Sequence, residues 1–284
     1  MAAPAVLSLR SAIQDDHSRL ANLLHFEAHV HRHLDWRRPL DWLGASPFLV
    51  AESAGRMNAA LACPPDPPGI GWIRLFAVNA RMQPDIAWQT LWPAAQNALE
   101  EMGAVQAAAI PFDNWFRKLI SASGFEHTHN VVVLEWKAAK NDGVPGQTHF
   151  IRTMQPSDIS EVHAVDVAAF TPLWQNSEAA LTAALKQSEV ATVIEEDGEI
   201  VAYQISTQST QGLHLARLAT HPRYQGRGLA QRLVQDVQRK LVENHGSALS
   251  VNTQDINLPS LALYDKLGFE LNGEQFPVYK LPLK

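Results

Sequence analysis

The chain has 284 residues, of which 46% are hydrophobic and 18% charged, so it is long enough for one or two globular domains with ample core. Its formal net charge is −6, which disfavours nucleic acid as a partner because phosphate-backbone binding needs a positive surface. No apolar run approaches the roughly 20 residues that span a bilayer, and no signal peptide is evident, so we expect a cytoplasmic protein without membrane association. The single cysteine, Cys63, excludes an internal disulfide framework.

An internal repeat divides the chain. Leu-Arg-Ser-Ala-Ile-Gln-Asp-Asp at 9–16 recurs as Ile-Arg-Thr-Met-Gln-Pro-Ser-Asp at 151–158. Each copy reads as strand, helices, hairpin, long strand, helix, strand, helix and strand, which predicts a mixed α/β sheet. Residues 140–148 are polar and rich in helix-breaking residues, so we expect a linker there between domains at 1–139 and 149–284.

Two features of the first copy suggest ligands. His25, His29 and His33 would share one face of a helix, a spacing that can bind a transition metal, but no further ligand group accompanies them and no metal site is predicted. Seven of the eight tryptophans lie in this copy, where they would form either an aromatic cage for a cationic substrate or, as we expect for most of them, hydrophobic core. They are Trp36, Trp42, Trp72, Trp88, Trp92, Trp115 and Trp136.

The second copy opens with a clear hairpin signal. An apolar run at 190–196 meets Asp197-Gly198, a dipeptide typical of two-residue hairpin turns. A second apolar run, 213–220, predicts the long strand that follows. Beyond that strand, Leu229, Leu233, Val237 and Leu241 recur every four residues, which predicts an amphipathic helix packed on a sheet.

The segment between this strand and this helix is the most informative of the chain. It reads Arg-Tyr-Gln-Gly-Arg-Gly at 223–228. Glycines let backbone N–H groups approach an anion, and a helix N-terminus adds partial positive charge, so the loop predicts a phosphate or pyrophosphate site. Arg217, Arg223, Arg227 and Arg232 cluster around it and favour a polyphosphate. The sequence matches neither a Walker loop nor the dinucleotide fingerprint.

The loop resembles the acyl-CoA pyrophosphate loop, Q/R-x-x-G-x-G/A, of the GNAT superfamily of N-acetyltransferases. Downstream, Asn-Leu-Pro-Ser-Leu-Ala-Leu-Tyr-Asp-Lys-Leu-Gly-Phe at 257–269 is similar to that family's second cofactor segment. The resemblance implies two tandem GNAT-like domains, each a mixed, mostly antiparallel sheet flanked by helices, in a layout similar to mycothiol-synthase-like enzymes. It also implies transfer of an acyl group, usually acetyl, from acetyl-CoA to an amine acceptor by direct attack in a ternary complex.

Site residues follow from the same resemblance. Tyr264 matches the family's general acid, which protonates the departing thiolate. The strand before the loop would splay open and offer its backbone to the pantetheine arm. The residues implied to bind acyl-CoA are Leu218, Ala219, Thr220, Arg223, Gln225, Gly226, Arg227, Gly228, Leu229, Ala230, Asn257, Ser260 and Tyr264. The general base stays open among His214, His221, Glu195 and Glu196.

The first copy lacks the features that face the ligand. Arg-Met-Gln-Pro-Asp-Ile at 81–86 aligns with the loop and puts Pro84 and Ile86 where Gly226 and Gly228 stand. Proline has no N–H to donate, and Ile120 replaces Tyr264. We therefore expect residues 1–139 to be a non-catalytic domain that completes a substrate cleft or gives structural support. Two alternatives to an enzyme remain, a non-catalytic acyl-CoA sensor and a structural repeat protein that holds a partner.

Overall fold

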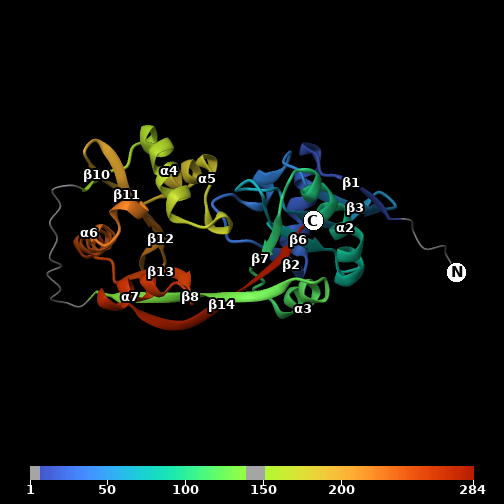
Figure 1. Cartoon of the computed structure of the whole chain (residues 1–284). Coiled ribbons are helices and arrows are strands. Elements are labelled where there is room, and N and C mark those ends of the chain that lie inside the picture. Colours follow the sequence, from blue (N-terminus) through green and yellow to red (C-terminus); the bar gives the residue numbers. More distant parts are fainter. Residues whose placement is uncertain (1–6, 139–150) are drawn as a thin grey trace. The chain divides into compact units, whose positions relative to one another are not determined.

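The computed structural model describes residues 7–138 and 151–284, and the expected linker at 140–148 lies outside these ranges. The chain divides into two compact units, shown in Figure 1. Unit 1 comprises residues 1–128 and 276–284, and unit 2 comprises residues 129–275. Among the described residues, no helix combines the length and the hydropathy needed to cross a membrane.

Unit 1 carries the first sequence repeat. Strands β1, β3, β4, β6 and β2 form one antiparallel sheet in that order, and β5 pairs in parallel with β7. Its elements are β1 (Ser8–Ser11), α1 (His17–Phe26), β2 (His29–Arg32), β3 (Phe48–Ser53), β4 (Arg56–Ala62), β5 (Ile70–Trp72), β6 (Leu75–Val78), α2 (Pro84–Glu101), β7 (Gln106–Ala109) and α3 (Asn114–Ala122).

Unit 2 carries the second repeat. Its strands follow the order β9-β10-β11-β12-β13-β8, antiparallel throughout except for the parallel pair β12 and β13. Figure 1 shows α6 on one side of β10–β12 and α4 with α5 on the other. Its elements are β9 (Ile151–Thr153), α4 (Ile159–Ala169), the short helix η4 (Pro172–Trp174), α5 (Glu178–Gln187), β10 (Val190–Glu196), β11 (Glu199–Ser209), β12 (Gly212–Thr220), α6 (Leu229–Glu243), β13 (Ala248–Gln254) and α7 (Leu258–Lys266).

Two long strands pair with strands of the other repeat. β8 (Glu126–Lys137) ends the first repeat, but from Val131 onward it pairs with β13 of unit 2. β14 (Glu270–Pro282) ends the second repeat, but its last residues pair with β7 of unit 1. Each unit is thus completed by a strand from the other repeat, so the compact units differ from the expected ranges 1–139 and 149–284.

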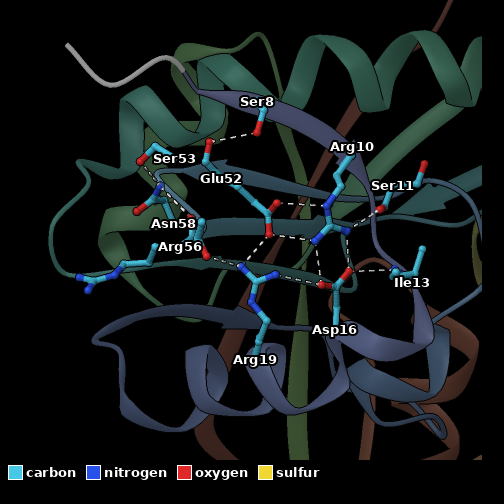
Figure 2. A network of polar contacts seen from close by, with 11 residues as sticks. Ser8, Arg10, Ser11, Ile13, Asp16, Arg19, Glu52, Ser53, Arg56 and Asn58 are labelled. Carbon is cyan, nitrogen blue, oxygen red and sulfur yellow. Dashed lines mark hydrogen bonds and ion pairs between the residues drawn. The ribbon is translucent and has the colours of Figure 1, made fainter. Parts of the chain in front are cut away.

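The repeat extends to individual contacts. In unit 1, Arg10 forms hydrogen bonds with both carboxylate oxygens of Asp16 and also contacts Glu52, while Arg19 adds a second cation (Figure 2). In unit 2, Arg152 holds Asp158 and Glu195 in the same way. The two hairpins share a bulge at equivalent places, between Ala51 and Glu52 and between Ile194 and Glu195. The predicted duplication is therefore structural as well as sequential.

The hydrophobic patterns place the cores. The stripe on α6 is buried at all four predicted positions: Leu229 and Leu233 pack with residues of β10 and β11, and Val237 and Leu241 pack with residues of β12 and β13. Removing such side chains from water contributes about 25 cal/mol per Å² of apolar area, which outweighs the modest helix propensity of a single segment. The helix begins at Leu229, as its spacing predicts, and the long strand before it covers the predicted range 213–220.

Candidate functional site

β12 and β13 separate part of the way along their length. Their parallel pairing covers four residue pairs and ends at Leu215 with Val251. Both strands then continue, β12 to Thr220 and β13 to Gln254. A bulge on β12 at Ala216, where the register with β11 shifts, lies at the same point. From this split onward, the β12 edge that faced β13 has no strand partner among the described residues, as the resemblance predicts.

The open edge leads to the glycine loop. Leu218, Ala219 and Thr220 lie on it and pair only with β11 among the described strands. The four residues from Arg217 to Thr220 span roughly 13 Å at about 3.3 Å per residue. An extended ligand arm could therefore run along this edge by hydrogen bonding to backbone groups, as an added strand does.

The loop backbone has the conformation that its glycines permit. Gly226 has φ +79° and Gly228 has φ +77°, values that residues with a Cβ rarely adopt. No atom lies within 4 Å of where a Cβ would stand at either position, so the space beside the loop is open. The glycines are required by backbone conformation and by access rather than by crowding.

Helix α6 starts directly behind this loop. Gly228 is its N-cap, and the first backbone hydrogen bond into the helix runs from the Arg232 amide to the Gly228 carbonyl. The amides of Leu229 and Ala230 therefore lack an intrahelical carbonyl partner. Together with the helix dipole, these N–H groups suit an anion such as a pyrophosphate.

The arginines around the loop divide into two groups. Arg223, Arg227 and Arg232 are exposed at the loop and the first turn of α6. Arg227 forms an ion pair with Glu196 at 3.1 Å and lies over the Tyr224 ring, so it braces the loop. Gln225 braces it as well, since its side chain donates to the Thr220 carbonyl at 3.2 Å. Arg217 does not belong to this cluster, because it points to the other face of β12 and is paired there.

Asn257 and Ser260 cap a helix. Asn257 is the N-cap of α7, where its side-chain oxygen accepts a hydrogen bond from the Ser260 amide at 3.3 Å. Such a cap contributes about 1 kcal/mol to helix stability. Both residues lie where α7 begins, just past the end of β13.

Tyr264 on α7 is a buried phenol. Its ring is 4% exposed and packs with β12, β13 and α6 in one hydrophobic cluster, with Phe269 as its aromatic neighbour at 5.4 Å. Burial raises its pKa well above the usual value for a tyrosine, so it is protonated at neutral pH. A phenol held in this state can donate a proton but has no tendency to ionise beforehand.

The four candidates for the general base occupy different environments. Glu195 pairs with Arg152, Glu196 pairs with Arg227, and His221 Nδ1 accepts the Arg223 amide, so these three have structural contacts. His214 differs, because its register partner Ser250 lies one residue before the last β12–β13 pair. Its Nδ1 lies 2.9 Å from the Ser250 hydroxyl, and burial lowers its pKa, which favours the neutral imidazole.

Sequence reasoning missed a buried polar cluster beside the split. Asp166 on α4 is 0% exposed and accepts hydrogen bonds from the Tyr203 hydroxyl and from Arg217 Nε, the latter at 2.7 Å. Arg217 Nη2 also donates to the Trp174 carbonyl at 2.7 Å, and the guanidinium lies 3.6 Å from the centre of the Phe170 ring. Burial raises the pKa of Tyr203, so its hydroxyl stays protonated. A lone aspartate in the otherwise apolar segment Val-Asp-Val-Ala-Ala at 165–169 was the available signal.

The corresponding segment of unit 1 offers fewer backbone amides to a ligand, because a helix and local hydrogen bonds occupy it. Pro84, which aligns with Gly226, is the first residue of α2, so the helix extends into the positions of the glycine loop. The amides of Arg81 and Met82 donate to the side chain and the carbonyl of Asn79, and the Ala80 amide donates to Glu27. No glycine in the left-handed region stands in this segment.

The open edge is also filled in unit 1. β5 and β6 together match β12, and β5 pairs with β7 as β12 pairs with β13. β6, the part beyond the split, pairs with β4 on one edge and with β2 on the other, over four residue pairs from His29 to Arg32. Strand β2 thus occupies the edge that has no strand partner within the described part of unit 2, where the equivalent segment forms the short helix η4.

The histidine and tryptophan expectations have different outcomes. The prediction that His25, His29 and His33 share one face of a helix was wrong, because α1 ends at Phe26 and His29 lies on strand β2. Residues 7–138 and 151–284 contain no group of three His, Cys, Asp or Glu side chains arranged to hold a metal. Most of the tryptophans are core, as expected: Trp88 and Trp92 stack at 5.1 Å in unit 1, and Trp136 is buried in unit 2.

Comparison with known proteins agrees with this geometry. Residues 159–269 match the family model of the acetyltransferase (GNAT) family. A search of curated proteins found no match. Among solved structures, the chain is similar to a GCN5-related N-acetyltransferase from Sphaerobacter thermophilus, with 14% identity, a TM-score of 0.60 and coverage of 100% of this chain and 98% of that chain.

Two further structures cover nearly the whole chain. A tandem GNAT protein from the clavulanic acid biosynthesis pathway has 14% identity, a TM-score of 0.62, and coverage of 98% of this chain and 99% of that chain. A probable N-acyltransferase from Enterococcus faecalis has 10% identity, a TM-score of 0.69, and coverage of 99% and 73%. At these identities the likeness shows the fold. The chain has a tandem GNAT fold, and its residues 159–269 match the model of the GNAT acetyltransferase family.

Proposed function

We propose that unit 2 transfers an acetyl group from acetyl-CoA to a primary amine of a small molecule or peptide. The observation that carries this proposal is the split between β12 and β13, which opens a backbone edge leading to the glycine loop. The pantetheine arm would lie along Leu218–Thr220, and the pyrophosphate would accept hydrogen bonds from the amides of Gln225 to Ala230. Arg223 would add charge at the exposed side of the loop.

The reaction needs one bond made and one broken. The amine nitrogen attacks the thioester carbonyl carbon and forms a C–N bond, and the C–S bond breaks to release the CoA thiolate. The proton lost by the nitrogen passes to a base, and Tyr264 gives its own proton to the thiolate. The thioester end of the arm would lie near the split. Holding both reactants in one cleft there would bring the thioester within reach of the amine.

His214 is the base that fits best. It lies at the split, and its neutral imidazole, which contacts only a hydroxyl, can accept a proton. The other three candidates are engaged differently, because both glutamates pair with arginines and His221 accepts a backbone amide. Unit 1 would bind no acyl-CoA, because α2 replaces the loop and β2 fills the edge. Its role in this proposal is support for the catalytic unit through the exchanged strands β8 and β14.

The first experiment is a calorimetric titration of acetyl-CoA into the full chain and two matched glycine variants. Gly228→Ala puts a Cβ at φ +77° on the proposed phosphate site. Gly198→Ala puts one at φ +84° in a hairpin turn, also with no atom within 4 Å, so its backbone strain is equivalent.

The expected result is one site per chain in the wild type and in Gly198→Ala. In Gly228→Ala, the affinity should fall about tenfold or more, because the added side chain both strains the loop and stands where the ligand would be. Two sites per chain would contradict the assignment of unit 1, and no heat of binding in any protein would contradict the acyltransferase proposal.

A further inference from the structure

The buried cluster of Asp166, Tyr203 and Arg217 is absent from the equivalent places of unit 1. Strand registers align Arg217 with Leu75 and Tyr203 with Ala60, and the repeat offset aligns Asp166 with Leu24. These three residues pack in one hydrophobic cluster of unit 1. The fold is therefore formed without the polar cluster.

Keeping a buried ion pair has a cost that apolar residues avoid. Replacing such a pair with well-packed hydrophobic side chains is often neutral or stabilising, because the charges need no desolvation. Unit 2 nevertheless keeps the pair where its open edge is intact, and unit 1 has lost it where the edge is filled. This correlation within one chain points to a ligand-related role.

The guanidinium of Arg217 is held on three sides. Its Nε and Nη2 atoms face Asp166 at 2.7 and 2.6 Å, Nη2 also donates to the Trp174 carbonyl, and one face lies on the Phe170 ring. A guanidinium has five N–H donors, and these contacts use three of them. The two on Nη1 have no protein acceptor among the described residues, although the side chain is only 13% exposed.

The side chain that carries those two donors starts beside the split, at the acyl end of the proposed site. Arg217 follows Ala216, the bulge residue at the split, and its side chain points to the α4 side of β12. Leu218 packs against a hydrophobic cluster that includes Leu229 and Leu233 of α6, whereas Arg217 contacts Asp166 of α4, so the two residues face opposite sides of the sheet. An acceptor that approaches the thioester from the α4 side would meet Nη1.

We infer that Arg217 binds a carboxylate of the acyl acceptor, which is therefore a small amine that also carries a carboxylate, such as an amino acid or a short peptide. The inference rests on the proposed acetyltransferase function of unit 2. A fixed guanidinium with two free donors is suited to a carboxylate, because planar N–H groups and carboxylate oxygens match in geometry and charge. The immobilisation by Asp166 and Phe170 means that little side-chain entropy is lost on binding.

The test compares acids with their own amides. Acetyl transfer from acetyl-CoA is measured for the common amino acids and some dipeptides, and for the same compounds with the carboxylate converted to a carboxamide. The carbon skeleton is the same in each pair, and the rates are compared at equal concentrations of the unprotonated amine, because a carboxamide lowers the pKa of the neighbouring ammonium. For the accepted amines, kcat/KM should be about 10- to 100-fold higher for the acid, the range of a charge-assisted hydrogen bond.

Two variants separate recognition from folding. Arg217→Lys keeps the charge beside Asp166 but loses the planar fork, so the KM for the acid should rise about tenfold or more while the affinity for acetyl-CoA stays unchanged. The triple variant D166L/Y203F/R217L introduces an apolar cluster like that of unit 1, with no buried charge left unpaired. It should fold, bind acetyl-CoA, and show equal kcat/KM for each acid and its amide.

The outcomes distinguish the inference from the function beneath it. Equal use of acids and amides by the wild type, or acetyl transfer to neither while acetyl-CoA binds, would overturn the role of Arg217. Unchanged preference for the acid in the triple variant would overturn it as well. Failure of the wild type to bind acetyl-CoA would instead refute the proposed function.

Discussion

Arg10 and Arg152 stand 142 positions apart and hold their aspartates in the same way. Arg10 contacts the two oxygens of Asp16 at 2.6 and 2.8 Å, and Arg152 contacts those of Asp158 at 2.6 and 3.0 Å. Each aspartate also accepts the backbone N–H three residues before it. Both units thus keep this Arg–Asp pair, whereas the open strand edge and the glycine loop are present only in unit 2.

The Arg10–Asp16 and Arg152–Asp158 pairs should each stabilise the unit in which they lie. The Arg10 guanidinium lowers the pKa of Asp16 to about 2, and Arg152 lowers that of Asp158. Because each folded pKa lies below its unfolded value near 3.9, the stabilisation is complete above that value and is lost as pH falls toward about 2. Asp16→Asn should lower the free energy of unfolding by about 2 kcal/mol at pH 7, and Asp158→Asn should lower it as well.

The measurement is thermal or urea unfolding of both variants at pH 7 and at pH 3. The difference from wild type should shrink at the lower pH, since the carboxylates of the unfolded chain take up protons there while those of the folded chain stay mostly ionised. A difference that is the same at both pH values would show that the pairs contribute through packing rather than through charge.

Replacing Tyr264 by Phe tests the proposed acid. The ring is buried, so the variant keeps its packing, and the acetyl-CoA affinity should stay near that of the wild type. Turnover should fall by about 10²- to 10⁴-fold, the usual contribution of a general acid. Steady-state kinetics and calorimetry on the same preparation provide both numbers. Undiminished turnover would exclude the acid role, and binding without turnover in the wild type would favour an acyl-CoA sensor.

His214→Gln tests the proposed base in the same way. Glutamine can still contact the Ser250 hydroxyl, so the strand pairing at the split should survive. The variant should lose about 10²-fold in kcat/KM, and it should lose the acid limb of the wild-type pH–rate profile, because that limb reports the protonation of the base. Since burial lowers the His214 pKa, the wild-type limb should lie below pH 6.5. A limb that persists in His214→Gln would assign the base to another group.

Local sequence signals predicted the parts of the site that depend on neighbours in the chain. The Asp197-Gly198 hairpin, the α6 stripe and the glycine loop before it all follow from short-range sequence patterns. The separation of β12 from β13 was predictable only through the resemblance, because no short sequence pattern indicates where the pairing of two strands ends.

Non-local pairing explains what the sequence did not reveal. His29–Arg32 reads as part of a helix, yet it forms β2, because β6 offers it a buried edge that is distant in the chain, 45 residues away at the His31–Phe76 pair. Tertiary burial overrides helical spacing in such short segments. Arg217 looked like a phosphate ligand because its charge was counted along the chain, whereas its partner Asp166 lies 51 residues earlier. Likewise, the repeats do not reveal that β8 and β14 are exchanged, since either strand would fit either sheet by pattern.

Acidification should weaken unit 1 through a buried histidine. His31 stacks on Phe116 at 4.1 Å, and its Nε2–H donates to the Ile73 carbonyl at 3.1 Å. Burial lowers its pKa to about 3. The folded state therefore binds fewer protons than the unfolded state between about pH 6.5 and 3, so stability falls as pH falls through this window.

The free energy of unfolding should fall with pH by at most about 1.4 kcal/mol per pH unit for each such histidine. Urea unfolding followed by tryptophan fluorescence, between pH 7.5 and 5.5, reports mainly on unit 1, where six of the eight tryptophans lie. His31→Gln keeps a donor for the Ile73 carbonyl but cannot titrate, so it should reduce the slope. His214→Gln, which removes a buried histidine from unit 2, is the matched control and should leave the unit 1 transition unchanged. An unaltered slope in His31→Gln would mean that the acid sensitivity comes from other groups, the buried His33 first among them, since burial also lowers its pKa.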